Sequence, residues 1–263
     1  MKFALVDGQQ QEAKPGLAGY CKFCESPCVA KCGEKNVWHW AHAKRVACDP
    51  WWENETEWHR AWKNNFPKEW QEVVHFSETG EKHIADVKTG KGLVVEFQHS
   101  HINPEERNAR ENFYKNMVWI VDGTRRKSDF KKFMVFLEDS RSLGELVPVR
   151  KLSSFLDESR LVLDWCYSNA PVIFDFKENT LWVLLEKLTK NRYILPINRS
   201  SLTSLLNSEH DSNSFKAVIN TFNTFTSDYE VEIARQQRLS VGGNIFAPNL
   251  SNNQISRVSR RRF

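Results

Sequence analysis

The sequence lacks any long apolar run. No apolar segment at its start has the form of a signal peptide, and runs such as residues 117–121 are far too short to cross a bilayer. It also lacks a strong excess of one charge, because 37 Lys and Arg stand against 33 Asp and Glu, for a net charge of +4. A membrane span and a strongly basic DNA coat are therefore excluded, and we expect a cytoplasmic protein.

Internal repeats are absent as well, and the composition is not that of a disordered chain. Hydrophobic residues make up 40% and charged residues 27% of the 263 positions, which is typical of globular proteins. A chain of this length forms one large or two modest domains and can bury a sizeable core.

Cysteine is nearly absent beyond the first fifth of the chain. Five of the 6 cysteines lie at positions 21, 24, 28, 32 and 48, and seven of the 8 histidines fall between residues 39 and 101. In a reducing compartment, cysteines clustered near histidines favour metal binding over disulfides. We therefore expect the chemistry to lie in the N-terminal part.

Two pairs of metal ligands have a spacing that closes a tetrahedral zinc site. Cys21 and Cys24 form a Cys-x-x-Cys pair, and His39 and His42 form a His-x-x-His pair. All four positions would be filled by protein, so the Zn²⁺ would be structural, holding together a small ribbon that has little core of its own.

Other sets of ligands stay open. Cys28 and Cys32 complete an alternative four-cysteine set, and Cys48 is an alternative to one of the histidines. Buried free thiols with packing histidines are the remaining alternative, without metal.

Helix and strand patterns follow one another between residues 54 and 123, as in an α/β unit. Apolar residues at helical spacing predict a helix over 54–66, and period-two runs between glycine-containing turns predict strands over 72–76, 82–87 and 92–97. Asn103 and Pro104 begin a helix that runs to about residue 116, and the apolar run that follows predicts a central strand.

Acidic side chains meet at one of these hairpins. A turn at its two glycines places Asp86 opposite Glu96 on antiparallel strands, with Cβ atoms about 5 Å apart. Two carboxylates at that distance repel each other and raise one pKa unless a cation lies between them. Gln98 points to the same face as Glu96. The alternative is that these side chains are solvated on an exposed face.

The helix before the hairpin carries a polar stripe. Glu55, His59 and Lys63 are spaced four residues apart and lie on one face. At 100° per residue Glu55 projects toward the face centred on Trp62, which packs on the sheet. The helix therefore aims a carboxylate at the same region as the hairpin.

Five blocks of the sequence occur in the order and spacing of the competence protein CoiA family of predicted nucleases. They are YCKFC, GEKNVWHWAH, ETEWHRAWK, HIADV and VVEFQHSHINPEERNARENFYKNMVWIVDG. The chain resembles this family over about residues 15–123. It also resembles the wider PD-(D/E)xK, restriction-endonuclease-like superfamily, with Gln98 where most members have a lysine.

The resemblance implies an α/β (α+β) fold with a restriction-endonuclease-like core, in which helices flank a mixed central sheet. We expect a strand and zinc-ribbon-like element over residues 1–50 and the nuclease core over 51–125. Helical patterns at 129–140 and 154–169, with strand patterns at 171–176, 181–187 and 192–197, predict a smaller α+β module over 126–232. Residues 233–263 contain no acid and predict a flexible basic tail.

The resemblance also implies a divalent-metal-dependent DNA nuclease. Asp86 and Glu96, with Glu55, would hold Mg²⁺ or Mn²⁺, which prefer oxygen ligands. Gln98 would orient the attacking water. Lys63 would supply the positive charge that a glutamine lacks, and His59 would position the phosphate or fix Glu55.

Several basic residues are expected to contact nucleic acid. They are Arg60, Arg107, Arg110 and the two histidines that flank Ser100, His99 and His101, together with the Arg-rich terminus. The two histidines are, alternatively, a pair of metal ligands. An RNA-directed enzyme differs only in its substrate.

A second class of function stays open, because Gln98 stands where most members of the superfamily have a lysine. It is a catalytically inactive, zinc-containing nucleic-acid-binding or adaptor protein. The resemblance implies a role in DNA processing and recombination or in defence against phage. A homo-oligomer, or a complex with a recombination or defence protein, is compatible with either class.

Overall fold

The computed structural model describes residues 1–46, 48–51, 55–145, 147–186, 191–208 and 214–241. The chain divides into two compact units, one of residues 1–101 with 109–119 and the other of residues 102–108 with 120–263. It is a mixed α/β protein with two sheets. No helix in the described ranges combines the length and the apolar character that a membrane span requires.

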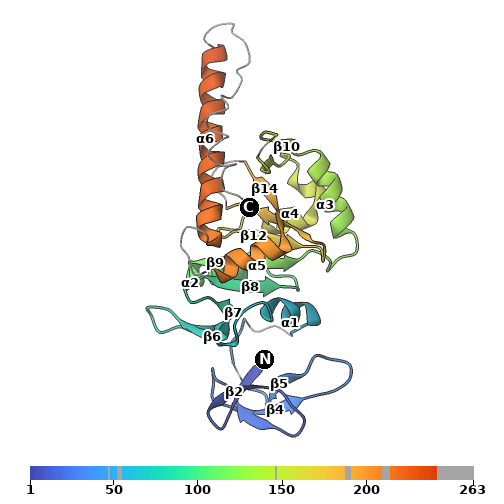
Figure 1. Cartoon of the computed structure of the whole chain (residues 1–263), viewed down its shortest axis with the longest axis vertical. Helices are drawn as coiled ribbons and strands as arrows, with labels where there is room; N and C mark the ends of the chain where they lie inside the picture. Colours follow the sequence, from blue (N-terminus) through green and yellow to red (C-terminus); the bar gives the residue numbers. More distant parts are fainter. Residues whose placement is uncertain (47, 52–54, 146, 187–190, 209–213, 242–263) are drawn as a thin grey trace. The chain divides into compact units, whose positions relative to one another are not determined.

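The first unit begins with a small antiparallel sheet (Figure 1). Its strands are β1 (Phe3–Val6), β2 (Gln9–Glu12), β3 (Ala18–Tyr20), β4 (Pro27–Lys31) and β5 (His39–His42), in the order β2-β1-β3-β4-β5. Strands β1 and β3 approach closely at Gly19, where a Cβ atom would lie 2.7 Å from the carbonyl oxygen of Leu5. A side chain at this position would push the two strands apart.

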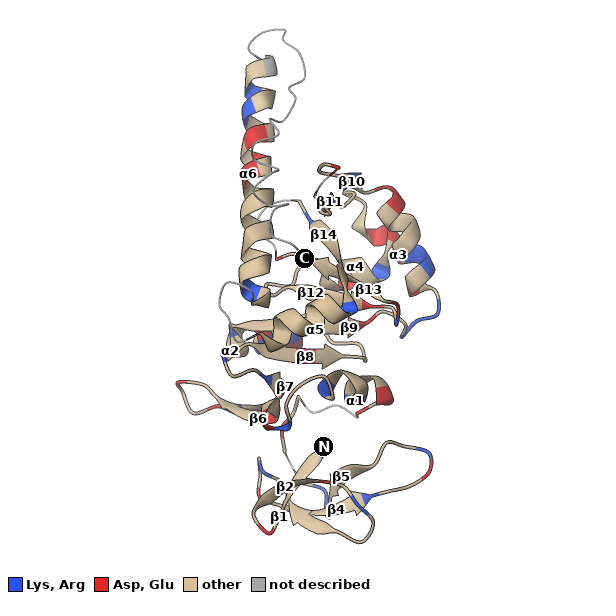
Figure 2. Cartoon of the chain, viewed as in Figure 1, with Lys and Arg blue, Asp and Glu red and all other residues tan. Residues whose placement is uncertain are grey.

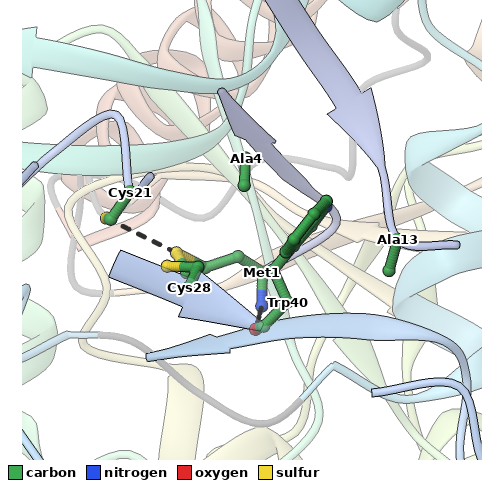
Figure 3. Close-up of a cluster of buried hydrophobic side chains, with 6 residues drawn as sticks. All are labelled: Met1, Ala4, Ala13, Cys21, Cys28 and Trp40. Atoms are coloured by element: carbon green, nitrogen blue, oxygen red, sulfur yellow. Dashed lines mark hydrogen bonds between the residues drawn. The ribbon is translucent and has the colours of Figure 1, made fainter. Parts of the chain in front are cut away.

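The core of this sheet is small (Figure 3). Its buried members are Met1, Ala4, Ala13, Cys21, Cys28 and Trp40. The indole N–H of Trp40 donates to the carbonyl oxygen of Gln11 at 2.9 Å, so this buried polar group is satisfied. A core of this size gives the element little stability of its own.

The rest of the first unit contains the predicted α/β elements. They are α1 (Glu57–Lys63), the short 3₁₀ helix η1 (Lys68–Trp70), β6 (Gln71–Phe76), β7 (Lys82–Lys88), β8 (Val94–Gln98), α2 (Pro104–Tyr114) and β9 (Met117–Asp122). The strand order is β9-β8-β7-β6, with β7 antiparallel to both β6 and β8. The second unit contributes the first turn of α2 and the end of β9. The predicted hairpins are confirmed.

Helix α1 begins later than the apolar pattern predicts. Thr56 is its N-cap. The Thr56 hydroxyl accepts from the backbone N–H of His59, and the His59 ring in turn accepts from the backbone N–H of Thr56. This reciprocal capping box fixes the start of the helix at Glu57. Residue 54, where the helix was predicted to begin, lies outside the described residues.

The second unit has helices and strands within the segments predicted after residue 126, together with two short strands and two helices in its described residues that the sequence pattern did not predict. Its helices are α3 (Asp129–Glu138), η2 (Leu156–Glu158), α4 (Arg160–Trp165), α5 (Arg199–Asn207) and α6 (Phe215–Val241). Its strands are β10 (Arg141–Ser142), β11 (Arg150–Lys151), β12 (Val172–Asp175), β13 (Thr180–Leu184) and β14 (Tyr193–Asn198), in the order β10-β11-β14-β13-β12-β9. Helices α3 and α6 carry charges of both signs (Figure 2).

Helix α6 extends into the segment predicted to be a flexible tail. Residues 233–241 are helical, and Glu232 supports them by pairing with Arg235 and accepting from Gln236 one turn further on. The sequence contains no Pro or Gly between the start of α6 and Gly242. The remainder of the predicted tail, residues 242–263, lies outside the described residues.

Candidate functional site

Four potential metal ligands gather in the N-terminal part of the first unit. The ligand atoms of Cys21, Cys24, His42 and Cys48, here called the thiol–imidazole cluster, all lie within 4.8 Å of one another. Cys21 Sγ lies 3.8 Å from Cys48 Sγ, and Cys24 Sγ lies 3.3 Å from His42 Nε2. A zinc tetrahedron with Zn–S of about 2.3 Å and Zn–N of about 2.0 Å has edges of about 3.8 and 3.5 Å. The donor set therefore fits Zn²⁺.

A tight turn presents the first two thiols. The N–H of Cys21 donates to the carbonyl of Ser26, and the N–H of Glu25 donates to the carbonyl of Cys21, with Glu25 in the left-handed region at φ 59°. Burial acts to raise the pKa of Cys24, but hydrogen bonds from Ser26 and from neighbouring thiols outweigh it and lower the pKa to about 6. The thiolate that a metal requires is thus favoured at neutral pH.

The expected ligand His39 is not part of this cluster, and Cys48 takes its place. Successive side chains of a strand point to opposite faces, so His39 and His42, three residues apart on β5, cannot face the same ion. The His39 ring instead contacts the carbonyl of Val37 through Nδ1 at 2.9 Å. The sequence left Cys48 open as the replacement, and the geometry selects it.

The alternative cysteines also lie outside the cluster. Cys28 is 1% exposed in the core of the small sheet, and burial raises the pKa of its thiol to about 11. Cys32 is half-buried against the same core. The four-cysteine set is therefore not assembled.

A cavity of about 50 Å³ lies elsewhere in the first unit and has an acidic lining. We call it the acid-lined cavity. It has room for a few water-sized groups. Its acids come from the loop before α1 and from three strands, and its two basic side chains come from α1 and α2. The acids are Asp49, Glu55, Glu72, Asp86 and Glu96, and the bases are Lys63 and Arg110.

Three of the acids form a row across neighbouring strands. Val87 pairs with Gln71 on one side and with Val95 on the other. In the same registers, the residue before Val87 on β7, Asp86, lies between Glu72 of β6 on one side and Glu96 of β8 on the other. The predicted opposition of Asp86 and Glu96 is thus confirmed.

Asp86 and Glu96 also replace hydrogen bonds of the β-ladder. The backbone N–H of Asp86 donates to Glu96 Oε1 at 3.1 Å, and the N–H of Phe97 donates to Asp86 Oδ2 at 3.0 Å. Burial, followed by repulsion from Asp86, raises the pKa of Glu96 to about 8, although Arg110 opposes the shift. A cation between the two carboxylates would relieve this repulsion.

Lys63 is the centre of the ionic network in this cavity. Its Nζ lies 3.0 Å from Asp86 Oδ1, 3.2 Å from Glu72 Oε1 and 3.5 Å from Glu55 Oε1. The side chain is buried, which acts to lower the pKa of Lys63, but attraction from Asp86, Glu72 and Glu55 outweighs burial and raises it. Lys63 is therefore a buried ammonium held by three acids.

Glu72 is a site residue that the sequence did not reveal. Its carboxylate accepts from the backbone N–H groups of Lys2 and Phe3 at 2.7 and 3.1 Å, in addition to its contact with Lys63. Burial alone would raise the pKa of Glu72, but Lys63 and these hydrogen bonds lower it to about 2. The strand pattern of the sequence is a signal that places Glu72 opposite Asp86. The φ of Glu72, 50°, is unusual for a residue with a side chain, and no pattern in the sequence signals it.

His59 holds α1 against the sheet. Its Nε2 donates to the carbonyl of Phe97 at 2.9 Å, since a carbonyl only accepts, and its Nδ1 lies 2.9 Å from the hydroxyl of Thr56. Both ring nitrogens are engaged by the protein. His59 also lines the acid-lined cavity, and its predicted role toward phosphate or Glu55 stays a prediction.

Gln98 and Glu55 differ from their predicted roles. Gln98 is 1% exposed, donates to Ser100 and is not among the residues that line the acid-lined cavity. Glu55 lines it but pairs with Arg60 and Lys63. Its Oε1 has no hydrogen-bond partner in the described part of the chain.

The residues predicted to contact nucleic acid differ from one another in their burial and in their partners. Arg60 pairs with Glu55 and donates to the carbonyl of Trp38. Arg107, in the second unit, is buried and donates to the carbonyl of Asp164, which makes it unsuitable as a phosphate contact.

Arg110 is buried in the acid-lined cavity, where it donates to Glu96 at 3.3 Å and to the carbonyl of Trp51 at 2.8 Å. His99 is half-buried beside the rings of Trp58 and His59, and His101 is exposed. Their contact with phosphate, or with a metal ion as a pair, stays a prediction.

Asp86 and Glu96 are two facing carboxylates of the acid-lined cavity, and each of their oxygens already has a partner in the protein. Asp86, Glu96 and Glu55 do not bring three oxygens within 4.8 Å of one another, because the thiol–imidazole cluster alone meets that criterion among the described residues. Mg²⁺ commonly binds through one or two carboxylates and keeps its remaining waters. Asp86 and Glu96 offer two such carboxylates, whereas Glu55 pairs with Arg60 and Lys63.

The chain matches no family model, no curated protein and no solved structure. The argument for function therefore rests on the geometry of these side chains.

Proposed function

We propose that the protein is a nuclease that depends on a divalent metal ion and hydrolyses phosphodiester bonds of DNA. The observation that carries the proposal is the pair of carboxylates, Asp86 and Glu96, facing each other across β7 and β8 with the ammonium of Lys63 beside Asp86. The order α1, three antiparallel strands, α2 and β9 supports a restriction-endonuclease-like core.

The charge of the cavity supports a cation. Five acids and two basic side chains line it, and burial weakens the screening of that excess by solvent. The pKa of Glu96 is raised first by burial and then by repulsion from Asp86, so a further positive charge at this place would favour its ionised form. Mg²⁺ or Mn²⁺ would supply it.

Each side chain has a distinct task in the proposed reaction. Asp86 and Glu96 would hold the cation, which when bound polarises the scissile phosphate and lowers the pKa of a water. Lys63 would stabilise the charge that develops on the phosphate, a task that the buried Gln98 cannot perform. Glu72 and Glu55 would keep the ammonium of Lys63 in place.

A cleavage assay tests the proposal. Purified full-length protein with Mg²⁺ or Mn²⁺ should convert supercoiled plasmid to nicked or linear forms. Asp86→Asn, Glu96→Gln and Lys63→Met should each lower the rate by about 100-fold or more, because the first two remove a charge that would hold the cation and the third removes the charge that would stabilise the reacting phosphate. Glu78→Gln and Lys91→Met change exposed residues at nearby turns and serve as matched controls. Equal rates in the wild type and the three site variants would refute the proposal.

A second candidate function is binding of nucleic acid without cleavage. It is favoured by Lys63 and Arg110, which already neutralise part of the acidic charge without any metal ion. In that case the wild type would bind DNA with an affinity that falls with salt and would cut no substrate in Mg²⁺ or Mn²⁺.

For the thiol–imidazole cluster, we infer a structural Zn²⁺. Three thiols and one imidazole supply all four positions of a tetrahedron, so no position stays open for a substrate or a reactive water. Bound zinc would join the turn after β3, the end of β5 and the segment at Cys48, which the small core holds only weakly.

A further inference from the structure

A second cavity, of about 360 Å³, lies in the first unit and has a different character. Its apolar wall includes Trp40, Val46 and Ile84, and the loop after β5 contributes the basic side chains of Lys44 and Arg45. The volume lies in the range of small-ligand sites, about 300–1,000 Å³. This second cavity is therefore large enough for an organic group rather than a lone ion.

The second cavity adjoins the acid-lined cavity. Met1, Asp49 and Ile84 line both of them. Ile84 and Asp86 lie two residues apart on β7, so their side chains point to the same face, about 7 Å apart along the strand. A polymer with a phosphate at Asp86 would thus bring its neighbouring unit to Ile84.

The charge of the second cavity is opposite to that of its neighbour. Lys44 and Arg45 are exposed, and neither has an ion-pair partner in the described ranges. Asp49 is the acid that lines this cavity. Its carboxylate already accepts from His83 Nδ1 at 2.8 Å and from the backbone N–H groups of Ile84 and Trp51 at 2.6 and 3.0 Å. The two free cations therefore dominate the electrostatics of the rim.

We propose that the second cavity binds the nucleotide next to the scissile phosphate of a single DNA strand. The base would pack on the apolar wall, and Lys44 and Arg45 would contact its phosphate. Strand-binding sites commonly combine an apolar or aromatic surface with a basic groove along the backbone. This inference rests on the proposed nuclease function, because that function places the neighbouring phosphate at Asp86.

The test measures binding separately from cleavage. Fluorescence anisotropy of a labelled single-stranded oligodeoxynucleotide is recorded with the full-length protein in Ca²⁺ instead of Mg²⁺. The double variant Lys44→Gln/Arg45→Gln should weaken binding about tenfold or more and reduce the slope of log affinity against log salt by about 0.7, since both side chains contact one phosphate and each neutralised phosphate of a single strand contributes about 0.7.

The matched control is Lys31→Gln/Lys35→Gln. It removes two exposed charges from the same part of the chain, outside the residues that line the second cavity. Its affinity should stay within about twofold of the wild type. Circular dichroism and metal content, measured for both double variants, should match the wild type, since all four side chains are exposed.

Two further arms identify the ligand. A strand of abasic nucleotides with the same charge should bind more weakly than the normal strand, because it offers nothing to the apolar wall. A free deoxynucleoside monophosphate that displaces the strand at micromolar concentration would show that the cavity takes monomers and would overturn the proposal.

The two hypotheses fail in different ways. Equal affinities of the two double variants, or no binding by the wild type, would overturn the second cavity as a nucleotide site. Binding that depends on Lys44 and Arg45, without cleavage in Mg²⁺ or Mn²⁺, would refute the nuclease and leave the nucleotide site supported.

Discussion

Lys63 is the residue on which the acid-lined cavity depends. It is 4% exposed and shared by Glu55, Glu72 and Asp86. A buried ion pair adds little net stability when it forms, but removal of one partner leaves a buried charge without compensation. The contribution of each acid around Lys63 is therefore best measured by replacing the acids one at a time with neutral residues.

Glu72→Gln is the most informative of these changes, because glutamine keeps the size of the side chain. Its single carbonyl oxygen can accept from only one of the N–H groups of Lys2 and Phe3, which Glu72 binds through different oxygens. Lys63 retains Glu55 and Asp86, so we expect a loss of about 1–3 kcal/mol in the free energy of unfolding, measured in urea. The rate of DNA cleavage should fall as well, since Lys63 loses one of the acids that would hold its ammonium in place.

Glu69→Gln is the control for this change, because Glu69 is exposed on the preceding 3₁₀ helix. A merely structural role of Glu72 would lower stability without lowering the rate of cleavage at a temperature where both variants are folded. Identical behaviour of the two variants would contradict the role assigned to Glu72.

At this scale the sequence predicts what depends on register and misses what depends on local backbone conformation. The opposition of Asp86 and Glu96 follows from a turn that the structure places at residues 89–93, where Gly92 has a φ of 78°. Glu72 was missed because its left-handed backbone and its partners at the start of β1 are set by tertiary contacts. His39 was assigned wrongly because strand alternation excludes a pair three residues apart.

Among the elements, the small N-terminal sheet is joined to β7 by the segment around Asp49. Cys48 belongs to the thiol–imidazole cluster, and the adjacent Asp49 binds both the ring of His83 and the backbone of Ile84. Trp51 then stacks on His83 with ring centroids 3.3 Å apart. A metal ion at Cys48 would thus stabilise the strand that carries Asp86.

A pair of variants tests the assignment of the cluster. Wild-type protein should contain one zinc ion per chain by mass spectrometry. Cys48→Ser should lose it, because serine is a poor zinc ligand, and should lower the melting temperature by about 5 °C or more.

His39→Ala is the matched control, since it removes the other candidate ligand from the same region. It should retain the zinc ion and melt within about 2 °C of the wild type. Loss of zinc from His39→Ala but not from Cys48→Ser would restore the Cys₂His₂ set that the spacing first indicated.

Elements with a strong periodic pattern were predictable, and their ends were less so. The hairpins of β6, β7 and β8 follow from alternation and from glycine positions. The start of α1 depends instead on the capping box of Thr56 and His59, and the length of α6 on pairs made by Glu232. These are side-chain interactions, which hydrophobic periodicity does not report.

For the whole molecule, the distribution of charge matters more than its sum. The chain has a net charge of +4, but the acid-lined cavity has five acids against two basic side chains. Burial of this charge links folding to pH. Two residues contribute in opposite directions, since the pKa of Glu96 is raised to about 8 and that of Glu72 is lowered to about 2, both from an ordinary value of 4.5.

The sign of each contribution predicts how the metal-free protein responds to pH. Folded Glu96 keeps its proton while the unfolded carboxyl ionises, so the stabilisation from this group is complete below pH 4.5 and is lost as pH rises toward 8. Folded Glu72 is ionised, so its stabilisation is present above pH 4.5 and is lost as pH falls toward 2. Melting temperatures measured in EDTA should therefore fall by several degrees between pH 5 and 8.

In Glu96→Gln the fall in melting temperature between pH 5 and 8 should disappear, because the glutamine side chain cannot ionise. Glu78→Gln should leave this fall unchanged. Mg²⁺ at pH 8 should raise the melting temperature of the wild type and not that of Glu96→Gln, since a ligand that binds the folded state stabilises it. The EDTA used for the metal-free series also removes weakly held zinc, so each sample is analysed for zinc before melting. A decline of equal size in Glu96→Gln, at equal zinc content, would show that the pH dependence arises outside the acid-lined cavity.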